Sequence, residues 1–273
     1  MDFSVLMSVY KNSKAAEVAA CLKSLYAQTA PSNNLVIVLD GPVGEDLQAL
    51  LTAEAVAHPE ITLCPLEKNV GLGEALKYGM DFCKNELVAR MDTDDLAVAD
   101  RFEKQLECFA LDNALSIVGA DIAEFTDDPE NIVSYRRVPQ AHEDICTFLK
   151  KRCPFNHMTV MFKKSEVTKA GGYLAWHYNE DSYLWARMYL AGCKFKNLPA
   201  VLCLARIDQD TFKRRGGYKY YKSERNLFRF MRQNKIIGRL ACFKANTLRF
   251  CVYVLTPNFI RERLFKKAVR EKK

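Results

Sequence analysis

The first 120 residues alternate short apolar runs with amphipathic segments, and this alternation restricts the possible folds more than any other feature of the sequence. The apolar runs cover residues 3–9, 35–39, 61–64, 87–91 and 116–120, and helical spacing covers about 15–26, 46–56, 72–83 and 101–111. Strands that alternate with helices of about ten residues form βαβ units, which build a mainly parallel sheet with helices on both faces. The sequence therefore predicts an α/β fold, in which ligands bind beyond the carboxyl ends of the strands.

The second half is less regular and ends in a strongly basic region. Apolar spacing predicts a strand at 158–162, a helix at 178–190, one or two short strands at 195–204, and helices after Tyr218. Residues 210–273 carry 19 Lys and Arg and 4 Asp and Glu, a net charge of +15, whereas residues 1–209 have a net charge of −8. We expect a folded body over 1–209 and a basic amphipathic helical region over 210–273, which suits a negatively charged partner.

Cysteine usage and apolar runs indicate a cytoplasmic protein without a membrane span. No C-x-x-C pair is present, so a zinc site has little support. Eight of the ten cysteines lie in apolar or amphipathic stretches, as small buried hydrophobic residues do: Cys21, Cys83, Cys108, Cys146, Cys193, Cys203, Cys242 and Cys251. Reduced thiols point to the cytoplasm. Residues 1–10 do not resemble a signal peptide, and the apolar run at 250–255 is too short to span a bilayer.

Three carboxylates directly follow the apolar run 87–91. Asp92, Asp94 and Asp95 repel one another unless a cation intervenes, and oxygen ligands of this kind suit Mg²⁺ or Mn²⁺. The structural alternatives are a solvated acidic turn, or a helix N-terminus that favours negative charge. Their position at the carboxyl edge of the predicted sheet favours the metal site.

Two further candidates follow other predicted strands. Asp40 closes the run 35–39, where its carboxylate can accept hydrogen bonds from a nucleotide base or ribose, although Asp before Gly is also common in turns. Asn69 and Gly71 precede the helical segment at 72–83. The glycine either allows close backbone approach to a ligand or does no more than help to cap the helix.

Each candidate site residue in the second half of the chain can be interpreted either as structural or as part of an active site. Glu180 and Asp181 begin a helical stretch, where a carboxylate can take a proton from an acceptor hydroxyl; taken alone, the common acidic helix start is the better interpretation. His157, before a strand, is more typical of a structural histidine. The basic loop with Arg214 and Arg215 either holds a diphosphate or only begins the basic region.

Taken in order, these elements resemble the family 2 inverting glycosyltransferases, which have the GT-A nucleotide-sugar fold. The resemblance covers roughly residues 3–206, and its segments are 4–10, 38–41, 69–71, 90–95 and 180–181 with Trp185 and Arg187. Within the family the chain is most similar to exopolysaccharide transferases of the amylovoran type, which residues 156–162 and 214–217 also resemble. One departure is Leu39, where many members carry a first acidic residue, so base recognition is left to Asp40 and backbone groups.

The resemblance implies a role for each candidate. Residues 1–120 become the nucleotide-sugar-binding half of the domain, and residues 121–209 the acceptor half. Asp181 becomes the general base with Glu180 beside it, and the metal ligands are Asp92, Asp94 and Asp95. The donor contacts implied are Asp40, Asn69, Gly71, Arg90, Asp92, Asp94, His157, Arg214 and Arg215.

The function implied is transfer of a sugar from a nucleotide diphosphate sugar, with a UDP-sugar as the best choice within the family. The acceptor would be a glycan, with an undecaprenyl-diphosphate-linked one as a candidate, in bacterial exopolysaccharide, capsule or O-antigen biosynthesis, and Mn²⁺ or Mg²⁺ would be the cofactor. Aromatic residues mix with Lys and Arg after Gly217, which suits an anionic membrane surface at the inner face of the cell membrane. The alternative is a helical appendage that packs on the body with a solvated basic face.

Two other functions compete. A nucleotidyltransferase also uses carboxylates, a metal and a nucleotide, but it normally shows a glycine-rich, basic signature near the first strand, and residues 10–13 are not one. A nucleic-acid-binding protein would use the basic region. It would leave the acidic cluster unexplained, and the net charge of −8 over residues 1–209 opposes a polyanion, so we expect no nucleic-acid partner.

Overall fold

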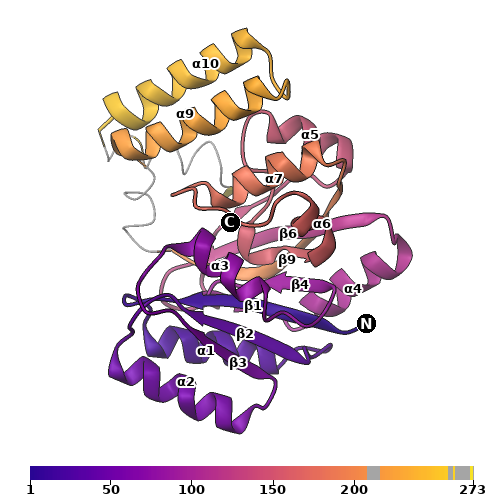
Figure 1. Ribbon diagram of the computed structural model, residues 1–273, viewed down its shortest axis with the longest axis vertical. Helices are drawn as coiled ribbons and strands as arrows, with labels where there is room; N and C mark the ends of the chain where they lie inside the picture. The colour runs from indigo at the N-terminus through magenta and orange to yellow at the C-terminus, as the bar shows by residue number, and fades with distance from the viewer. Residues whose placement is uncertain (208–215, 258–260, 262–270, 273) are drawn as a thin grey trace.

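A computed structural model describes residues 1–207, 216–257, 261 and 271–272, and within them one curved sheet organises the chain (Figure 1). Its strands are β1 (Phe3–Val9), β2 (Asn34–Leu39), β3 (Ile61–Pro65), β4 (Leu87–Arg90), β5 (Leu96–Ala97), β6 (Leu115–Phe125), β7 (Ile132–Arg136), β8 (Met161–Lys163), β9 (Lys194–Arg206) and β10 (Glu271–Lys272). The helices of the body are α1 (Ala15–Tyr26), α2 (Glu45–Ala57), α3 (Leu72–Met80), α4 (Arg101–Leu111), α5 (His142–Leu149), α6 (Lys164–Lys169) and α7 (Glu180–Leu190).

The sheet order is β10-β7-β6-β8-β4-β1-β2-β3, with β9 paired to β6 and β5. The strands β4, β1, β2 and β3 are parallel neighbours, and β6 and β9 form a long parallel pair. Antiparallel pairing joins β4 to β8 and β8 to β6. The predicted α/β fold with a mainly parallel sheet is confirmed. The carboxyl ends of β1, β2 and β4 meet at one edge.

Helices cover the first half of the sheet on both faces, because β1 and β2 present apolar side chains to both sides. Val5, Met7 and Val9 pack in one cluster with buried residues of α1, α2 and α4. Leu6 points to the opposite face and packs in a second cluster with residues of α3, α5 and α7. This two-sided burial holds the strand ends in a fixed plane.

Several element boundaries differ from the predicted ones for local reasons. The strand expected at 158–162 begins only at Met161, because a 3₁₀ turn, η1 (His157–Thr159), precedes it. The Thr159 hydroxyl donates to the Asn156 carbonyl at 2.8 Å, and Asn156 Nδ2 donates to the Ala120 carbonyl at 2.8 Å, which fixes the turn against β6. The helix expected from 178 begins at Glu180, since Tyr178 has a φ of 76°, outside helical geometry.

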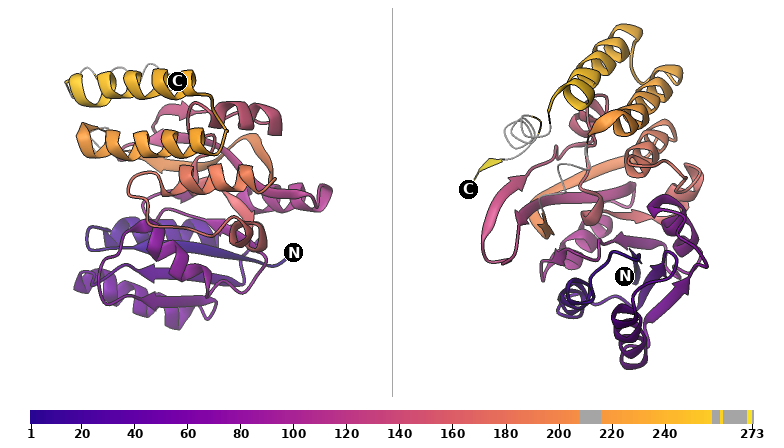
Figure 2. Two further views of the ribbon diagram at one scale, coloured as in Figure 1. Left: turned by 45° about the horizontal axis from the view of Figure 1, so that its top comes forward. Right: turned by 90° about the vertical axis from the view of Figure 1, so that its left-hand side faces the viewer.

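The basic C-terminal region forms a helical hairpin of α9 (Gly217–Gln233) and α10 (Arg239–Phe250), followed by the short helix η2 (Cys251–Leu255). Figure 2 shows it stacked beyond α7, away from the parallel strands. Leu227, Phe228 and Met231 of α9 are buried in a cluster that includes Ala186 of α7. The hairpin therefore packs on the body, as the alternative for this region required. The expected boundary between residues 209 and 210 lies outside the described residues.

Two other expectations can be compared with the described residues. Within that part of the chain, no helix has both the length and the apolar character that crossing a membrane requires. All ten cysteines are free, and most are buried or half-buried as expected. Cys251, the first residue of η2, is the exception, because it is exposed.

Candidate active site

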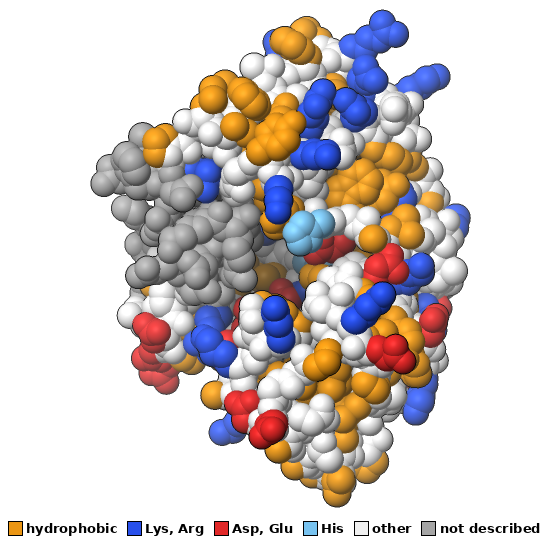
Figure 3. Space-filling view, turned by 60° about the vertical axis from the view of Figure 1, so that its left-hand side comes forward, with side chains coloured by type: hydrophobic (Ala, Val, Ile, Leu, Met, Phe, Trp, Pro, Cys, Tyr) orange, Lys and Arg blue, Asp and Glu red, His pale blue; other side chains and the backbone are white. Residues whose placement is uncertain are grey.

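A cleft of about 1080 Å³ opens at the edge where β1, β2 and β4 end. Figure 3 views the molecule from the side on which a hollow separates the sheet half from the hairpin half. The walls come from the segments after β1, β2 and β4, from the start of α3, and from the loop before α7. Among the predicted site residues, the cleft is lined by Asp40, Asn69, Gly71, Asp92, Asp94 and Glu180. The structure thus brings together residues that are far apart in the sequence.

The acidic cluster lies at the end of β4. Asp92, Asp94 and Asp95 each offer one carboxylate oxygen, and these oxygens lie within 4.8 Å of one another. The buried Arg90 guanidinium forms an ion pair with Asp92, while the buried Asp95 accepts a hydrogen bond from the backbone N–H of Arg206 at 2.8 Å. Partial desolvation in the cleft and the charge of Asp92 raise the pKa of Asp94 to about 6. The crowding of like charges indicates a place for a cation.

A buried arginine that the sequence analysis did not single out supports this strand end. Arg101, at the start of α4, donates to the Arg90 carbonyl at 2.7 Å and to Gln105 Oε1 at 3.2 Å. Burial lowers the pKa of Arg101 to about 10. An arginine at a helix start looks like a solvated residue in the sequence, so only its packing identifies it as support for the backbone before Asp92.

The carboxylate of Asp40 holds the loop that borders the cleft. Its oxygens accept hydrogen bonds from Asn69 Nδ2 at 2.9 Å, the Val70 N–H at 2.7 Å and the Gly71 N–H at 3.0 Å. Gly41 makes this possible, because a Cβ there would lie 2.5 Å from the backbone nitrogen of Asn69. Asp40, Asn69 and Gly71 therefore form one unit at the cleft wall.

The acidic pair at the start of α7 faces two different cavities. Glu180 lines the cleft, and burial and the charge of Asp181 raise its pKa to about 7. Asp181 instead lines a second cavity, of about 190 Å³, between the body and the hairpin. Its carboxylate accepts hydrogen bonds from the Ser182 N–H at 2.6 Å and from the Cys153 thiol at 3.4 Å. Tyr178 lines both cavities, so the two adjoin at this residue, close to the acidic pair.

The remaining predicted site residues lie elsewhere. His157 is half-buried and shares a 2.9 Å hydrogen bond with the buried Tyr173 hydroxyl. Burial and the nearby charge of Arg90 lower the pKa of His157 well below its usual range, and it lines neither the cleft nor the second cavity among the described residues. Arg214 and Arg215 lie outside the described residues.

Sequence reasoning also missed the loop before α7. Ala175, Trp176, His177 and Tyr178 line the cleft opposite the acidic cluster. The aromatic run ahead of Glu180 was the available signal. Gly73 of α3 lets this loop approach, since a Cβ on Gly73 would lie 2.6 Å from the Leu174 carbonyl oxygen.

The cleft therefore combines a carboxylate cluster at the strand ends of an α/β sheet with a carboxylate from the start of a helix. Residues 4–167 match the family described as Glycosyl transferase family 2, and the chain belongs to that family. The predicted family, fold and glycosyltransferase class are confirmed.

Individual proteins agree with this assignment. The chain is 40% identical over 254 residues to the amylovoran biosynthesis glycosyltransferase AmsE of Erwinia amylovora, covering 93% of each chain. It is 34% identical over 269 residues to the UDP-Gal:alpha-D-GlcNAc-diphosphoundecaprenol beta-1,3-galactosyltransferase of Escherichia coli, covering 98% of this chain and 96% of that one. The S. aureus TarS structure in complex with UDP-GlcNAc has a TM-score of 0.67 at 16% identity, covering 95% of this chain and 75% of that one, which shows the shared fold.

Proposed function

We propose that this glycosyltransferase moves a sugar from a UDP-sugar to a lipid-linked glycan, with inversion at the anomeric carbon, in bacterial exopolysaccharide, capsule or O-antigen biosynthesis. The observation that carries the proposal is that Glu180 and Asp181, adjacent in the chain, line two neighbouring cavities. One cavity holds the carboxylate cluster that suits a donor, and the other leaves room for an acceptor. The names of the Escherichia coli and Erwinia relatives support the substrate classes.

The donor side fits a divalent cation. Three carboxylate oxygens within 4.8 Å of one another, with a raised pKa at Asp94, form an oxygen donor set whose repulsion Mn²⁺ or Mg²⁺ would relieve. We propose Asp92 and Asp94 as ligands with Asp95 in support. When bound, the ion would neutralise the negative charge that develops on the departing nucleoside diphosphate. Arg90 holds Asp92 in place through their ion pair.

Other residues complete the donor site in this proposal. Asp40 fixes the loop 69–71, so that Asn69 and Gly71 border the nucleotide. Glu180, on the opposite wall, binds hydroxyl groups of the donor sugar. Arg214 and Arg215 stay candidates for binding the diphosphate.

His157 packs behind Arg90 and Tyr173, and we assign it a supporting position rather than direct donor contact. Its lowered pKa keeps the ring neutral at physiological pH, so it adds no charge behind the Arg90–Asp92 pair.

Asp181 is the proposed general base. A sugar hydroxyl is a poor nucleophile at neutral pH, so a positioned carboxylate must take its proton as the attack develops. The hydrogen bonds from Ser182 and Cys153 orient the Asp181 carboxylate in the second cavity. An acceptor that enters there attacks the donor sugar directly, and a single displacement inverts the anomeric carbon.

The hairpin supports a position at the cytoplasmic face of the membrane. Leu240, Phe243, Leu248 and Leu255 are 63–69% exposed and recur at helical spacing along α10 and η2. Figure 3 shows hydrophobic side chains beside Lys and Arg over the hairpin. An exposed apolar stripe flanked by cations suits the interface of an anionic membrane. We propose peripheral attachment there, where a lipid-linked acceptor resides.

A screen of nucleotide sugars tests the proposal. Binding of UDP-, GDP- and dTDP-sugars with and without MnCl₂ identifies the donor, and product analysis with a lipid-linked acceptor identifies the reaction. We expect Mn²⁺-dependent binding of a UDP-sugar and release of UDP. Release of pyrophosphate, or the absence of nucleotide-sugar binding in the presence of Mn²⁺, would contradict the proposal.

A further inference from the structure

We propose that the second cavity binds the acceptor and recognises the diphosphate that links the acceptor sugar to its carrier. This assignment rests on the proposed function, because it names the acceptor class for the base Asp181. The shared chemistry is a diphosphate anion, and its two possible sources are a glycosyl diphosphate lipid and free inorganic pyrophosphate.

The lining of the cavity has the chemistry of an anion site. Arg136 at the end of β7, Arg152 after α5 and Arg249 of α10 face the same space, together with the carboxylates Asp181 and Glu224. Three guanidinium groups against two carboxylates leave a positive balance, and arginine binds phosphate oxygens in a bidentate manner. The nearby donor cleft, by contrast, is bordered by carboxylates.

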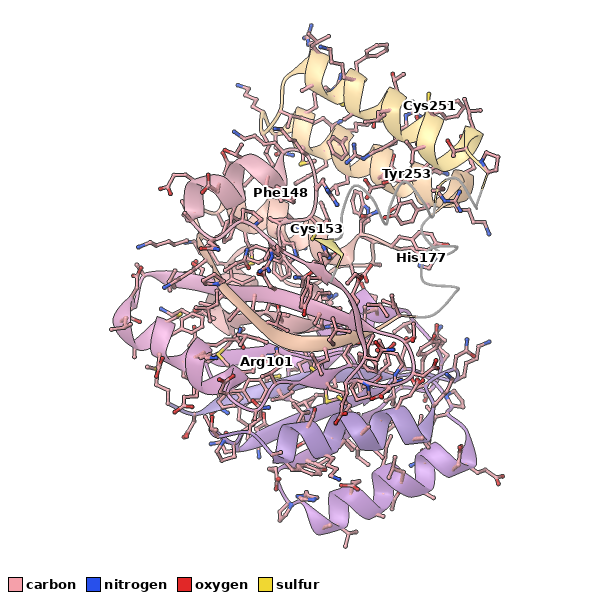
Figure 4. All side chains as sticks on the ribbon, turned by 180° about the vertical axis from the view of Figure 1, so that it is seen from behind. Arg101, Phe148, Cys153, His177, Cys251 and Tyr253 are labelled. Atoms are coloured by element: carbon pink, nitrogen blue, oxygen red, sulfur yellow. The ribbon has the colours of Figure 1, made fainter. Side chains whose placement is uncertain are left out.

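The arginines are held in place by defined contacts. Arg249 Nε donates to Glu224 Oε2 at 2.7 Å, and its guanidinium lies 3.9 Å from the centroid of the Phe228 ring. Arg136 donates to the Cys153 carbonyl at 3.3 Å. Figure 4 shows Cys153 and Tyr253, which line the cavity, between the body and the hairpin. Preorganised cations of this kind bind an anion with little loss of side-chain entropy.

Size and position favour a diphosphate over a nucleotide. The cavity has about 190 Å³, whereas the cleft has about 1080 Å³, which suits a whole nucleotide sugar. One wall is the hairpin, through Tyr220, Glu224 and Arg249. The same hairpin carries the exposed apolar stripe of α10, so a lipid carrier at the membrane would bring its diphosphate to this cavity.

Tyr178 is suited to hold the acceptor sugar at the junction. It lines both cavities, it is 38% exposed, and its φ of 76° is strained for an aromatic residue. Its ring lies 5.5 Å from the Tyr220 ring, measured between centroids. An aromatic face at this point can pack against the apolar face of a pyranose, and would position the attacking hydroxyl beside Asp181.

The test compares two acceptors and two variants in a transfer assay. The acceptors carry the same glycan, one on a lipid diphosphate and one on a neutral alkyl aglycone. Arg152→Gln removes a cation from the cavity, and Lys151→Gln removes the charge of the exposed neighbour, which does not line it. We expect Arg152→Gln to raise the KM of the diphosphate acceptor about tenfold, and to leave the KM of the neutral acceptor unchanged. Lys151→Gln should change neither value more than about twofold.

Equal KM values of the two acceptors for the unmodified protein, or equal effects of Arg152→Gln on both, would overturn the assignment. An unchanged rate with the neutral acceptor also shows that the variant is folded.

Binding of inorganic pyrophosphate, measured by calorimetry, is a second experiment. It is done in metal-free buffer, so that the carboxylates of the donor cleft repel the anion. Binding that Arg152→Gln weakens and Lys151→Gln does not supports an anion site, whether or not transfer has been observed, so this experiment separates failure of the site from failure of the proposed function. If pyrophosphate binds but does not compete with the acceptor, the cavity is a site for free pyrophosphate and not for the acceptor, which would contradict the proposal.

Two substitutions at Tyr178 test the sugar-binding part. Tyr178→Gly removes the ring and tolerates the positive φ, so the backbone is not disturbed. Tyr178→Phe keeps the ring. We expect about a tenfold lower kcat/KM for the acceptor in Tyr178→Gly and near-normal values in Tyr178→Phe, with a smaller change in donor affinity in both. Equal acceptor kinetics for the two variants would contradict a platform role.

Discussion

The cleft proposed for the donor and the second cavity adjoin at Tyr178 but are lined by side chains of opposite charge. The cleft gathers carboxylates at strand ends, whereas the second cavity gathers arginines from β7, the segment after α5, and α10. Both proposed ligands carry diphosphates. In our proposal a diphosphate anion is therefore bound in two ways. In the cleft a divalent cation lies between the carboxylates and the donor, whereas in the second cavity arginines bind the acceptor directly. Opposite surroundings of this kind would keep each diphosphate in its own cavity.

The largest effect is expected at Asp181, the proposed general base. Asp181→Asn preserves the shape of the side chain but cannot take a proton, so turnover should fall by about 10²–10⁴. Donor affinity should change little, because Asp181 does not line the cleft proposed to hold the donor. Initial rates and donor titrations check both statements. Near-normal transfer by this variant would remove Asp181 from the mechanism.

A comparable loss, about 10²–10³ in kcat/KM, is expected at the cation site. Asp94→Ala removes the exposed carboxylate of the cluster, so Mn²⁺ should no longer strengthen donor binding. Asp127→Ala, at an exposed carboxylate outside both cavities, is the matched control. Unchanged Mn²⁺-dependent donor affinity in Asp94→Ala would show that the cluster does not hold the ion.

A pH profile distinguishes Glu180 from its neighbour. Since burial and Asp181 raise the pKa of Glu180 to about 7, this group is mostly protonated at pH 6 and mostly ionised at pH 8. The ionised form accepts hydrogen bonds from donor hydroxyls, so kcat/KM for the donor should rise between these values. Glu180→Gln should remove the step and cost about tenfold at pH 8. A retained step in that variant would assign the titration to another group.

The smallest effect on catalysis is expected at the hairpin surface. The double substitution Leu240→Glu and Phe243→Glu should weaken binding to anionic vesicles roughly tenfold, because it removes apolar contacts and adds negative charge. The rate with a water-soluble acceptor should not change. Leu111→Glu, at an apolar position of the body that is 86% exposed, serves as the control. Vesicle binding that is insensitive to the double substitution would place the membrane contact elsewhere.

The first half of the site could be predicted from the sequence because its determinants are local. Strand–helix alternation places Asp40 and Asp92 at the same sheet edge without any knowledge of tertiary packing. The acidic pair at 180–181 could also be found. The sequence could not predict that the two residues of this pair line different cavities. Successive helical residues differ in direction by about 100°, and the sequence does not show which side of the helix faces the cleft.

The second cavity could not be predicted for a different reason. Arg136, Arg152 and Arg249 are far apart in the chain, and they face one space only because α9 packs on α7. In the sequence, Arg249 is one of many cations in a basic helix. Asp40 remains a proposed donor contact, but its hydrogen bonds to the loop 69–71 could not be read from the sequence. Long-range packing decided both cases.

The stereochemistry of the product tests most directly whether an acceptor in one cavity attacks a donor in the other. The measurement is the anomeric proton coupling of the transferred sugar, by NMR, after reaction with an α-linked UDP-sugar. Direct attack assisted by Asp181 predicts a β-linked product. An α-linked product would require a second displacement or attack from the same face, and would contradict the account.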